Sequence, residues 1–281
     1  MKILRTVGEV REALAFPRTR GLIGLVPTMG ALHEGHVSLI RAARAECDTV
    51  VVTLFVNPTQ FGDPADLQAY PRDEETDARI ASEAGANFVF APGVDEIYKS
   101  GHATWVDVQG AAEGLEGAYR PGHFRGVATV CLKLFLIANP HRAYFGQKDA
   151  QQVAVVKQMV QDLNVDLDIR VMPIVRAADG LALSSRNARL SSEERIRALA
   201  IPRALEAGIA AHRAGQDPVA AARMMLTNVD IDYVAVADFN GQPTLAIAAR
   251  VGRTRLIDNE ILDDRNADRA GHTHKEPPHG R

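Results

Sequence analysis

Short apolar runs alternate with longer amphipathic stretches along the first two thirds of this chain. The strand-length apolar runs lie at 22–26, 49–56, 87–90, 143–145 and 166–172. The stretches with helical spacing of apolar residues lie at 37–46, 73–84, 124–137 and 150–163. The run at 49–56 is mostly β-branched, which is typical of a strand buried on both faces. This order predicts an α/β fold, a Rossmann-like doubly wound parallel sheet with helices on both faces.

The pattern changes after about residue 175. Ser191 and Glu194 have the spacing of a capping box, which predicts a helix start. We expect helices to about residue 214, with a break or kink at Pro202, and another helix start where an aspartate precedes Pro218. Strand-like runs follow at 231–237, 244–249 and 254–257. We therefore expect a Rossmann-like domain over 1–174, a smaller α+β C-terminal domain over 175–262, and a polar, disordered tail over 263–281.

Composition and charge narrow the class of protein. The 281 residues carry a net charge of −3, which disfavours a protein that wraps nucleic acid. Two cysteines exclude a disulfide scaffold and a cysteine-rich zinc module. No apolar run approaches the roughly 20 residues that span a membrane, and residues 1–20 lack the apolar core of a signal peptide. We expect a cytoplasmic enzyme with neither nucleic acid nor membrane as a partner.

The segment at 27–36 follows a predicted strand and precedes a predicted helix. Gly30 and Gly35 allow a sharp turn, and the helix N-terminus favours an anion. His33 and His36 lie three apart and can face one ligand, donating hydrogen bonds to phosphate, more strongly if protonated. The alternative is a capping turn with two exposed histidines. A zinc-protease motif needs histidines four apart, so that class is disfavoured.

Two other segments offer polar groups near the same sheet edge. Asn57 and Gln60 follow the strand at 49–56, and their amides suit a small polar substrate. The alternative is a polar turn around Pro58. The acids at 73–77 begin a helix, where they favourably meet its dipole. One or two of them could also hold Mg²⁺ through water.

Cationic side chains follow in two further loops. Lys148 stands at a helix start, which the dipole disfavours unless an anionic ligand is present. Asp149 can cap that helix or accept from a ribose hydroxyl, and Gln152 can face the same crevice. The Ser-Ser-Arg sequence at 184–186 suits a phosphate clamp, or else a turn followed by a helix cap. Together these loops predict a nucleoside triphosphate held from two sides.

The segments PTMGALHEGH, FVNPTQF, FGQKDAQQ, DGLALSSRN and TRLIDN occur in this order. Over 21–259 the chain resembles the pantoate–β-alanine ligase family. The resemblance implies that pantoate attacks the α-phosphate of ATP, giving a noncovalent pantoyl adenylate and pyrophosphate. The amine of β-alanine then attacks the acyl carbon, giving pantothenate and AMP. It also implies Mg²⁺, a homodimer, and a smaller C-terminal domain that closes over the cleft.

The resemblance assigns roles to individual residues. The catalytic, phosphate-binding positions match His33, His36, Lys148, Ser184, Ser185 and Arg186. The remaining ATP-binding positions match Met29, Gly30, Gly146, Asp149, Val175 and Leu183. Pantoate would contact Gln60 and Gln152, and β-alanine would contact Gln60 and Asn57. The Mg²⁺-associated acid matches Asp77, although Asp73, where a threonine is expected, leaves the choice among neighbouring acids open.

Two rival functions remain at this point. A nucleotidylyltransferase with a phosphate-bearing acceptor shares the H-x-G-H logic, but the uncharged Gln60 and Gln152 favour a small hydroxy acid. A noncatalytic nucleotide sensor would bind ATP without releasing pyrophosphate. The joint presence of both histidines, Lys148 and the Ser-Ser-Arg clamp argues against the sensor.

Overall fold

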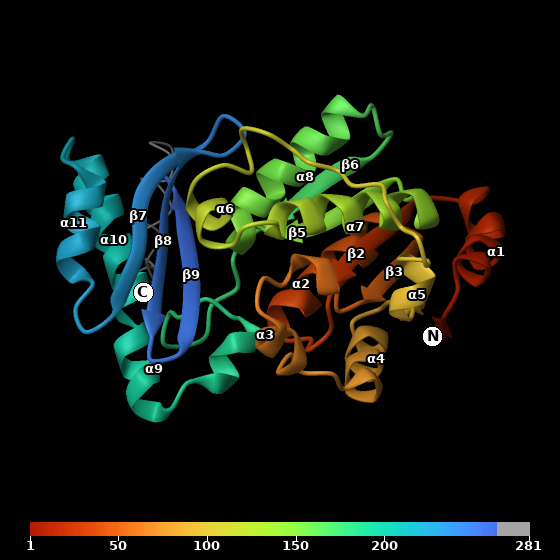
Figure 1. Cartoon of the computed structure of the whole chain (residues 1–281), viewed down its shortest axis with the longest axis horizontal. Helices are drawn as coiled ribbons and strands as arrows, with labels where there is room; N and C mark the ends of the chain where they lie inside the picture. Colours follow the sequence, from red (N-terminus) through yellow and green to blue (C-terminus); the bar gives the residue numbers. More distant parts are fainter. Residues whose placement is uncertain (263–281) are drawn as a thin grey trace, which may run out of the picture.

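The structure, a computed structural model, describes residues 1–262, and its larger part is built on a parallel sheet (Figure 1). The six strands are, in spatial order, β1 (Lys2–Leu4), β4 (Phe88–Phe90), β3 (Thr49–Leu54), β2 (Ile23–Thr28), β5 (Arg142–Gly146) and β6 (Asp168–Met172). The helices on one face are α1 (Val7–Arg18), α7 (His123–Ala138) and α8 (Ala150–Asp162). Those on the other face are α2 (Glu34–Glu46) and α4 (Glu74–Glu83). This arrangement confirms the predicted α/β class.

Strand β3 shows why its sequence is apolar without interruption. Side chains alternate between the two faces of a strand, and here both faces are covered by helices. Val51 packs in the cluster with α1, α7 and α8, whereas Val50 and Val52 pack in the cluster with α2 and α4. All three are fully buried.

The strand order places the site. From β2 the chain continues to β3 and β4 on one side, whereas β5 and β6 lie on the other side. The loops after β2 and β5 therefore diverge and leave a crevice at the carboxyl ends of two neighbouring strands, which pair at Leu25 and Ala143. Those loops carry the H-x-G-H segment and Lys148.

A second, antiparallel sheet lies at the opposite end of the view from α1 (Figure 1). Its strands are β7 (Asp230–Asp238), β8 (Pro243–Val251) and β9 (Thr254–Ile261). The helices that share its apolar core are α9 (Ser192–Ala198), α10 (Ala200–Arg213) and α11 (Pro218–Met225). The shorter connecting helices are α3 (Pro64–Gln68), α5 (Val94–Ile97), α6 (Leu115–Tyr119) and the 3₁₀ turns η1 (Pro58–Gln60), η2 (Gln147–Asp149) and η3 (Ser185–Arg189). The expected smaller α+β unit is confirmed.

In the C-terminal part, the predicted helix starts agree with the structure more closely than the predicted position of the helix break. The capping box of Ser191 and Glu194 is present. A break does lie beside Pro202, because α9 ends at Ala198 and α10 begins at Ala200. Pro202 itself lies in the first turn of α10, where a backbone N–H has no partner within the helix.

The chain begins with β1 and α1, which lie at one edge of the parallel sheet. The pattern analysis did not predict β1 and α1, although Thr6 and Glu9 form a capping box that signals α1. The tail expected at 263–281 lies outside the described residues. Within residues 1–262 no helix has the length and apolar character needed to cross a membrane.

Candidate active site

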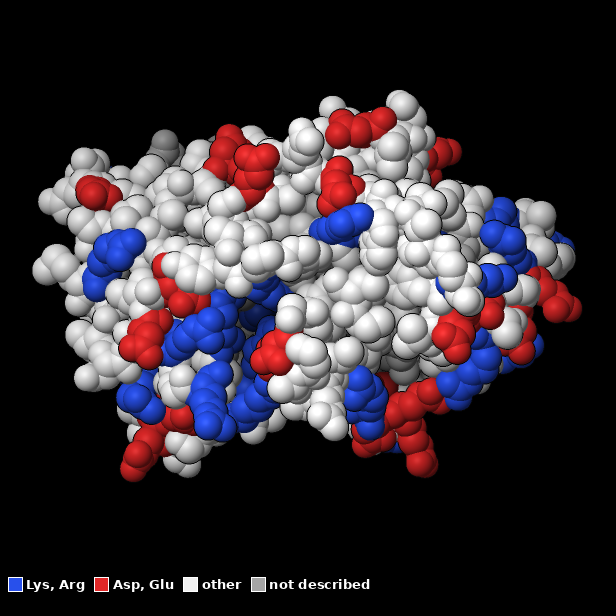
Figure 2. Space-filling model, in the orientation of Figure 1, with Lys and Arg blue, Asp and Glu red and all other residues white. Residues whose placement is uncertain are grey.

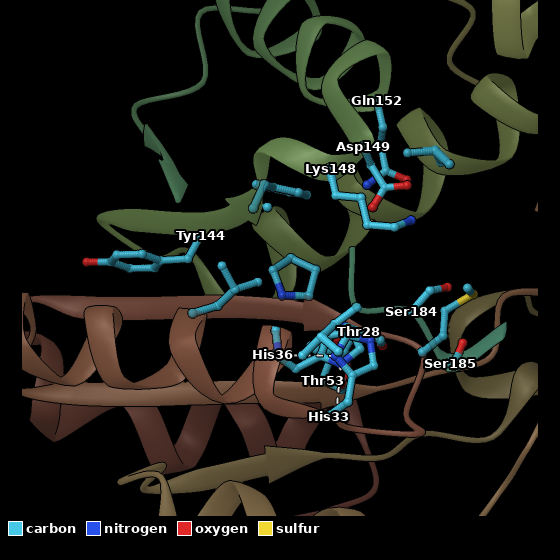
Figure 3. Close-up of a pocket in the computed structure, with 18 of the residues that line it drawn as sticks. Thr28, His33, His36, Thr53, Tyr144, Lys148, Asp149, Gln152, Ser184 and Ser185 are labelled. Atoms are coloured by element: carbon cyan, nitrogen blue, oxygen red, sulfur yellow. Dashed lines mark hydrogen bonds between the residues drawn. The ribbon is translucent and has the colours of Figure 1, made fainter. Parts of the chain in front are cut away.

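A cavity of about 220 Å³ opens at the carboxyl ends of β2, β3 and β5 (Figure 3). It brings together most of the residues that the sequence singled out. The predicted residues that line it are Met29, His33, His36, Asn57, Gln60, Gly146, Lys148, Asp149, Gln152, Val175, Leu183, Ser184, Ser185 and Arg186. Gly30 and Asp77 do not line it. Figure 3 shows the two histidines across the open space from Lys148, with Ser184 and Ser185 at its side.

Backbone hydrogen bonds to Nδ1 fix both histidine rings and leave Nε2–H of each ring as a donor. The Nδ1 atom of His33 accepts from the backbone of Gly35 at 3.1 Å, and that of His36 accepts from the backbone of His33 at 3.3 Å. A neutral ring that accepts at Nδ1 carries its hydrogen on Nε2. The rings lie 4.2 Å apart between centroids. The two Nε2–H groups are therefore available for one anionic ligand.

Burial keeps these rings uncharged. It lowers the pKa of His33 to about 4, assisted by the charge of Lys148. It lowers the pKa of His36 to about 3, assisted by His33 and then by Lys148. Both histidines are therefore neutral at pH 7 in the ligand-free protein, so their hydrogen-bonding role does not depend on protonation.

Asp77 organises the turn after β2. Its Oδ2 accepts from the backbone of Ala31 at 2.8 Å, and its Oδ1 accepts from Leu32 at 2.7 Å. Gly30 has φ +85, and a Cβ there would lie 2.7 Å from Asp77 Oδ2, so a side chain is excluded on two grounds. Burial raises the pKa of Asp77. The carboxylate holds the backbone that carries Met29 and His33, and the association of Asp77 with Mg²⁺ stays a prediction.

The amides at the end of β3 are ordered by a hydrogen-bond chain. Tyr98 donates its hydroxyl to Asn57 Oδ1 at 2.9 Å, and Thr59 donates to the same oxygen. The Asn57 Nδ2 group donates to Gln60 Oε1 at 3.1 Å and to the carbonyl of Gly126 at 3.1 Å. Asn57 thus has both amide hydrogens engaged, and its contact with β-alanine stays a prediction. Gln60 Nε2 donates one hydrogen to Met29 Sδ at 2.9 Å, and its second hydrogen is left to serve a ligand.

The loop after β5 is braced from the second sheet. Asn259 in β9 donates from Nδ2 to the carbonyls of Gln147 and Lys148, at 3.0 and 2.9 Å. Asp149 makes no side-chain capping bond to α8, so its carboxylate is not consumed as a cap. The side chain of Asp149 therefore does not cap α8, and its contact with a ribose hydroxyl stays a prediction. The backbone at Lys148 is thus held in part by a strand more than a hundred residues away in sequence.

The Ser-Ser-Arg clamp sits on a tight turn. Leu183 donates its backbone N–H to Val175 at 2.9 Å, and the turn between them passes through Gly180, with φ +89. Ser184 Oγ accepts from the backbone of Arg186 at 3.2 Å and so begins the 3₁₀ turn η3. The turn with a cap is therefore present, the same residues line the cavity, and their role as a phosphate clamp stays a prediction.

Sequence reasoning missed a second polar layer around α6. Arg120 donates to His123 Nε2 at 3.1 Å, so the hydrogen of His123 is on Nδ1 and is donated to the carbonyl of Gln60 at 3.0 Å. Glu116 accepts from both terminal nitrogens of Arg255 in β9, each at 2.7 Å. Glu116 lies in α6, Arg120 follows its end and His123 begins α7, so no single helical spacing in the sequence marks this group.

The fold and this cavity define an α/β enzyme whose site is built for an anionic ligand. Neutral N–H donors, an ammonium and a guanidinium line a crevice at the switch point of a parallel sheet. A family model described as pantoate-beta-alanine ligase matches residues 2–261. The chain belongs to the pantoate–β-alanine ligase family.

Individual relatives agree with this assignment. The chain is 51% identical to a pantothenate synthetase of Moorella thermoacetica over 280 residues, covering 94% of this chain and 99% of the relative. A crystal structure of pantothenate synthetase from Thermus thermophilus aligns with a TM-score of 0.88 and 44% identity, covering 93% and 99% of the two chains. A pantoate-beta-alanine ligase from Francisella tularensis, complexed with beta-gamma ATP and beta-alanine, aligns with a TM-score of 0.81 and 35% identity, covering 93% and 98%.

Proposed function

We propose that this ligase condenses pantoate with β-alanine at the expense of ATP, giving pantothenate, AMP and pyrophosphate. The observation that carries the proposal is the convergence of two Nε2–H donors, Lys148 and the Ser-Ser-Arg clamp on one cavity of a protein of this family. Such a set suits the triphosphate of ATP, because charge-assisted hydrogen bonds to phosphate are among the strong ones. The groups assigned to the triphosphate are His33, His36, Lys148, Ser184, Ser185 and Arg186.

The adenosine end is assigned to the remaining cavity walls. Met29, Gly146, Val175 and Leu183 line the same cavity, and Gly30 supports the turn beside Met29. Asp149 is the carboxylate in the lining and is assigned to a ribose hydroxyl.

The first step needs positioning rather than a base. The pantoate carboxylate is ionised at pH 7. One of its oxygens bonds to the α-phosphorus while the bond from that phosphorus to the α,β-bridging oxygen breaks, and pyrophosphate leaves with that oxygen. The Nε2 group of Gln60, together with Gln152, is assigned to hold pantoate in line. The cations screen the repulsion between two anionic reactants.

A magnesium ion fits this site only as a companion of the nucleotide. Among residues 1–262 no group of three or more His, Cys, Asp or Glu side chains could hold a metal. Mg²⁺ in nucleotide sites is commonly bound by phosphates, water and one or two carboxylates, so this does not conflict with the family expectation. Asp149 lines the cavity, whereas both oxygens of Asp77 already accept backbone N–H groups. The ion would neutralise phosphate charge.

The second step transfers the acyl group to nitrogen. The amine of β-alanine bonds to the acyl carbon, the carbon–oxygen bond to AMP breaks, and one amine proton passes to water. Cys131 lines the cavity, yet burial raises the pKa of its thiol to about 12, so it is not a thiolate nucleophile. This supports an adenylate that is not transferred to the enzyme. Asn57 and Gln60 are the residues assigned to the incoming β-alanine.

The decisive experiment follows the two products separately. The purified protein is incubated with ATP, Mg²⁺ and pantoate, with and without β-alanine. We expect pyrophosphate release to require pantoate, and steady AMP release to require β-alanine as well. Pyrophosphate release with phosphorylated acceptors but not with pantoate would favour the rival nucleotidylyltransferase. A covalent acyl-enzyme detected by mass spectrometry would contradict the noncovalent intermediate.

Domain bounds, oligomeric state and location are proposed as well. We propose domains at 1–174 and 175–262, the second closing over the cleft, because residues 175 and 183–186 line one wall of the cavity. We propose a homodimer, which sedimentation velocity tests. A cytoplasmic location also stays a prediction, in keeping with the two free, buried cysteines.

A further inference from the structure

A second cavity, rich in arginine, adjoins the first. It has a volume of about 390 Å³ and lies among the 61–66 segment, α6, η3 and the β8–β9 hairpin. We call it the arginine cleft, and its cationic residues are Arg120, Lys148, Arg186, Arg189, Arg250, Arg253 and Arg255. Figure 2 shows blue side chains gathered around a hollow on the side of the molecule that carries β8 and β9. Lys148, Ser184 and Arg186 line both cavities, so the two meet at these side chains.

The positive charge of the arginine cleft is not balanced by its own carboxylates. Seven cations face three lining acids, Asp63, Asp66 and Glu116, and Asp232 pairs with Arg250 and Arg255 from outside the lining, which leaves seven cations against four acids. Glu116 is already shared between Arg255 and Arg120, at 2.7 and 3.9 Å. Within residues 1–262 neither Arg186 nor Arg253 has a carboxylate partner.

Like charges are also held close together at the inner end. Arg120 is largely buried, and burial followed by the charge of Arg186 lowers its pKa to about 10. A protein keeps guanidinium groups in mutual repulsion at a stability cost, which a bound polyanion would offset.

The outer arginines belong to a rigid turn rather than to a free loop. Gly252 has φ +59, and a Cβ there would lie 1.9 Å from Glu194 Oε1, so the β8–β9 turn is packed on the start of α9. Arg250 pairs with Asp232 at 3.4 Å. Neither Arg250 nor Arg253 lines the central cavity, so they are not part of the triphosphate site described above.

We propose that the arginine cleft is a separate site for inorganic pyrophosphate, which receives this product as it leaves the central cavity. The proposal rests on the proposed function, because it concerns a product of the first step. Once the bond to the α-phosphorus is broken, pyrophosphate is no longer tethered to adenosine. It can then exchange contacts with the shared Lys148 and Arg186 for contacts with Arg250 and Arg253. Emptying the space beside the adenylate would disfavour the reverse reaction.

Calorimetric titration with inorganic pyrophosphate tests the cleft without turnover. The variants are Arg253→Gln, which loses no described ion pair, and the double variant Arg250→Gln, Arg253→Gln. The matched control is Arg11→Gln, Arg20→Gln, which removes two exposed charges from the α1 end of the molecule. We expect Kd for pyrophosphate to rise about threefold in Arg253→Gln and about tenfold in the double variant, since each tenfold change corresponds to about 1.4 kcal/mol. The control should match the wild type.

Steady-state kinetics separates this site from the ATP site. We expect the inhibition constant of added pyrophosphate to rise with Kd, while KM for ATP rises less than twofold. Equal losses for ATP and pyrophosphate, or an unchanged Kd for pyrophosphate in both variants, would overturn the proposal. Pyrophosphate release that does not depend on pantoate would instead refute the proposed function and leave the calorimetric result standing.

Discussion

Asn57→Asp is expected to reverse the Gln60 amide and so to remove most pantoate binding. In the wild type, Asn57 Nδ2 donates to Gln60 Oε1 at 3.1 Å, and Gln60 Nε2 donates one hydrogen to Met29 Sδ at 2.9 Å and keeps the other for the ligand. A carboxylate at position 57 can only accept. Gln60 would therefore turn its Nε2 group toward residue 57 and present Oε1 to the pantoate carboxylate.

The size of the effect follows from the hydrogen bond that is lost. A hydrogen bond to a charged group contributes about 1.5–3 kcal/mol, which corresponds to roughly 10–10²-fold in affinity. Tyr98→Phe is the milder companion, because it removes one of the bonds to Asn57 Oδ1 and leaves those from Thr59 at 3.3 and 3.0 Å. A typical net loss of about 0.5–1.5 kcal/mol predicts a two- to tenfold effect there.

The assay is pyrophosphate release at saturating ATP with pantoate varied. We expect KM for pantoate to rise in the order wild type, Tyr98→Phe, Asn57→Asp, while KM for ATP stays nearly constant. Asn164→Asp is the matched control, since it adds the same charge at the far end of α8 on an exposed residue. Equal KM for pantoate in the two Asn→Asp variants, or a parallel rise in KM for ATP, would refute the orientation argument. Thermal melting of each variant checks folding.

Three further outcomes are expected. Removal of one phosphate-binding donor, in His33→Ala, His36→Ala or Lys148→Ala, should lower kcat by about 10²–10³, as for other oxyanion donors; wild-type turnover in all three would reject their role. Asn259→Ala should lower kcat about tenfold with little change in melting temperature, because it releases the carbonyls of Gln147 and Lys148; an unchanged kcat would show that the loop after β5 does not need these two hydrogen bonds. The pKa values of His33 and His36, about 4 and 3 against 6.5 for an exposed histidine, mean that the unfolded chain binds protons first as pH falls. The free energy of unfolding, measured by urea denaturation, should therefore decrease from pH 6.5 to pH 4, and less so in His36→Gln; identical decreases would contradict this.

Local sequence signals predicted the elements that local interactions form. The uninterrupted apolar run of β3, the capping box at Ser191 and the turn around Gly180 each depend on residues close in sequence. The same holds for the H-x-G-H turn, where His33 itself is the N-cap of α2. Pro202 indicated the break between α9 and α10 but not its exact position, because the residue alone does not show whether a proline stands in the first turn or in the interior of a helix.

The family resemblance and the strand order together located the cavity, but not the contacts within it. Asn57 is an example: its residue type indicated a ligand-binding amide, but gave no sign of its partners Tyr98 and Gly126, 41 and 69 residues away, which hold it beside Gln60. Asp77 likewise belongs to a run of acids that suggested a metal, yet its oxygens accept from a backbone turn 45 and 46 residues earlier.

The sequence by itself determined the α/β class, the loops that carry the chemistry and the family to which they belong, because periodicity, capping and motif spacing act over a few residues. Only the tertiary structure decided the charge state of the histidines, since their pKa values depend on burial beside Lys148. It also decided the brace from Asn259 and the arginine cleft, which join side chains more than a hundred residues apart. Such contacts have no local sequence signature, because they arise where two separately built sheets meet.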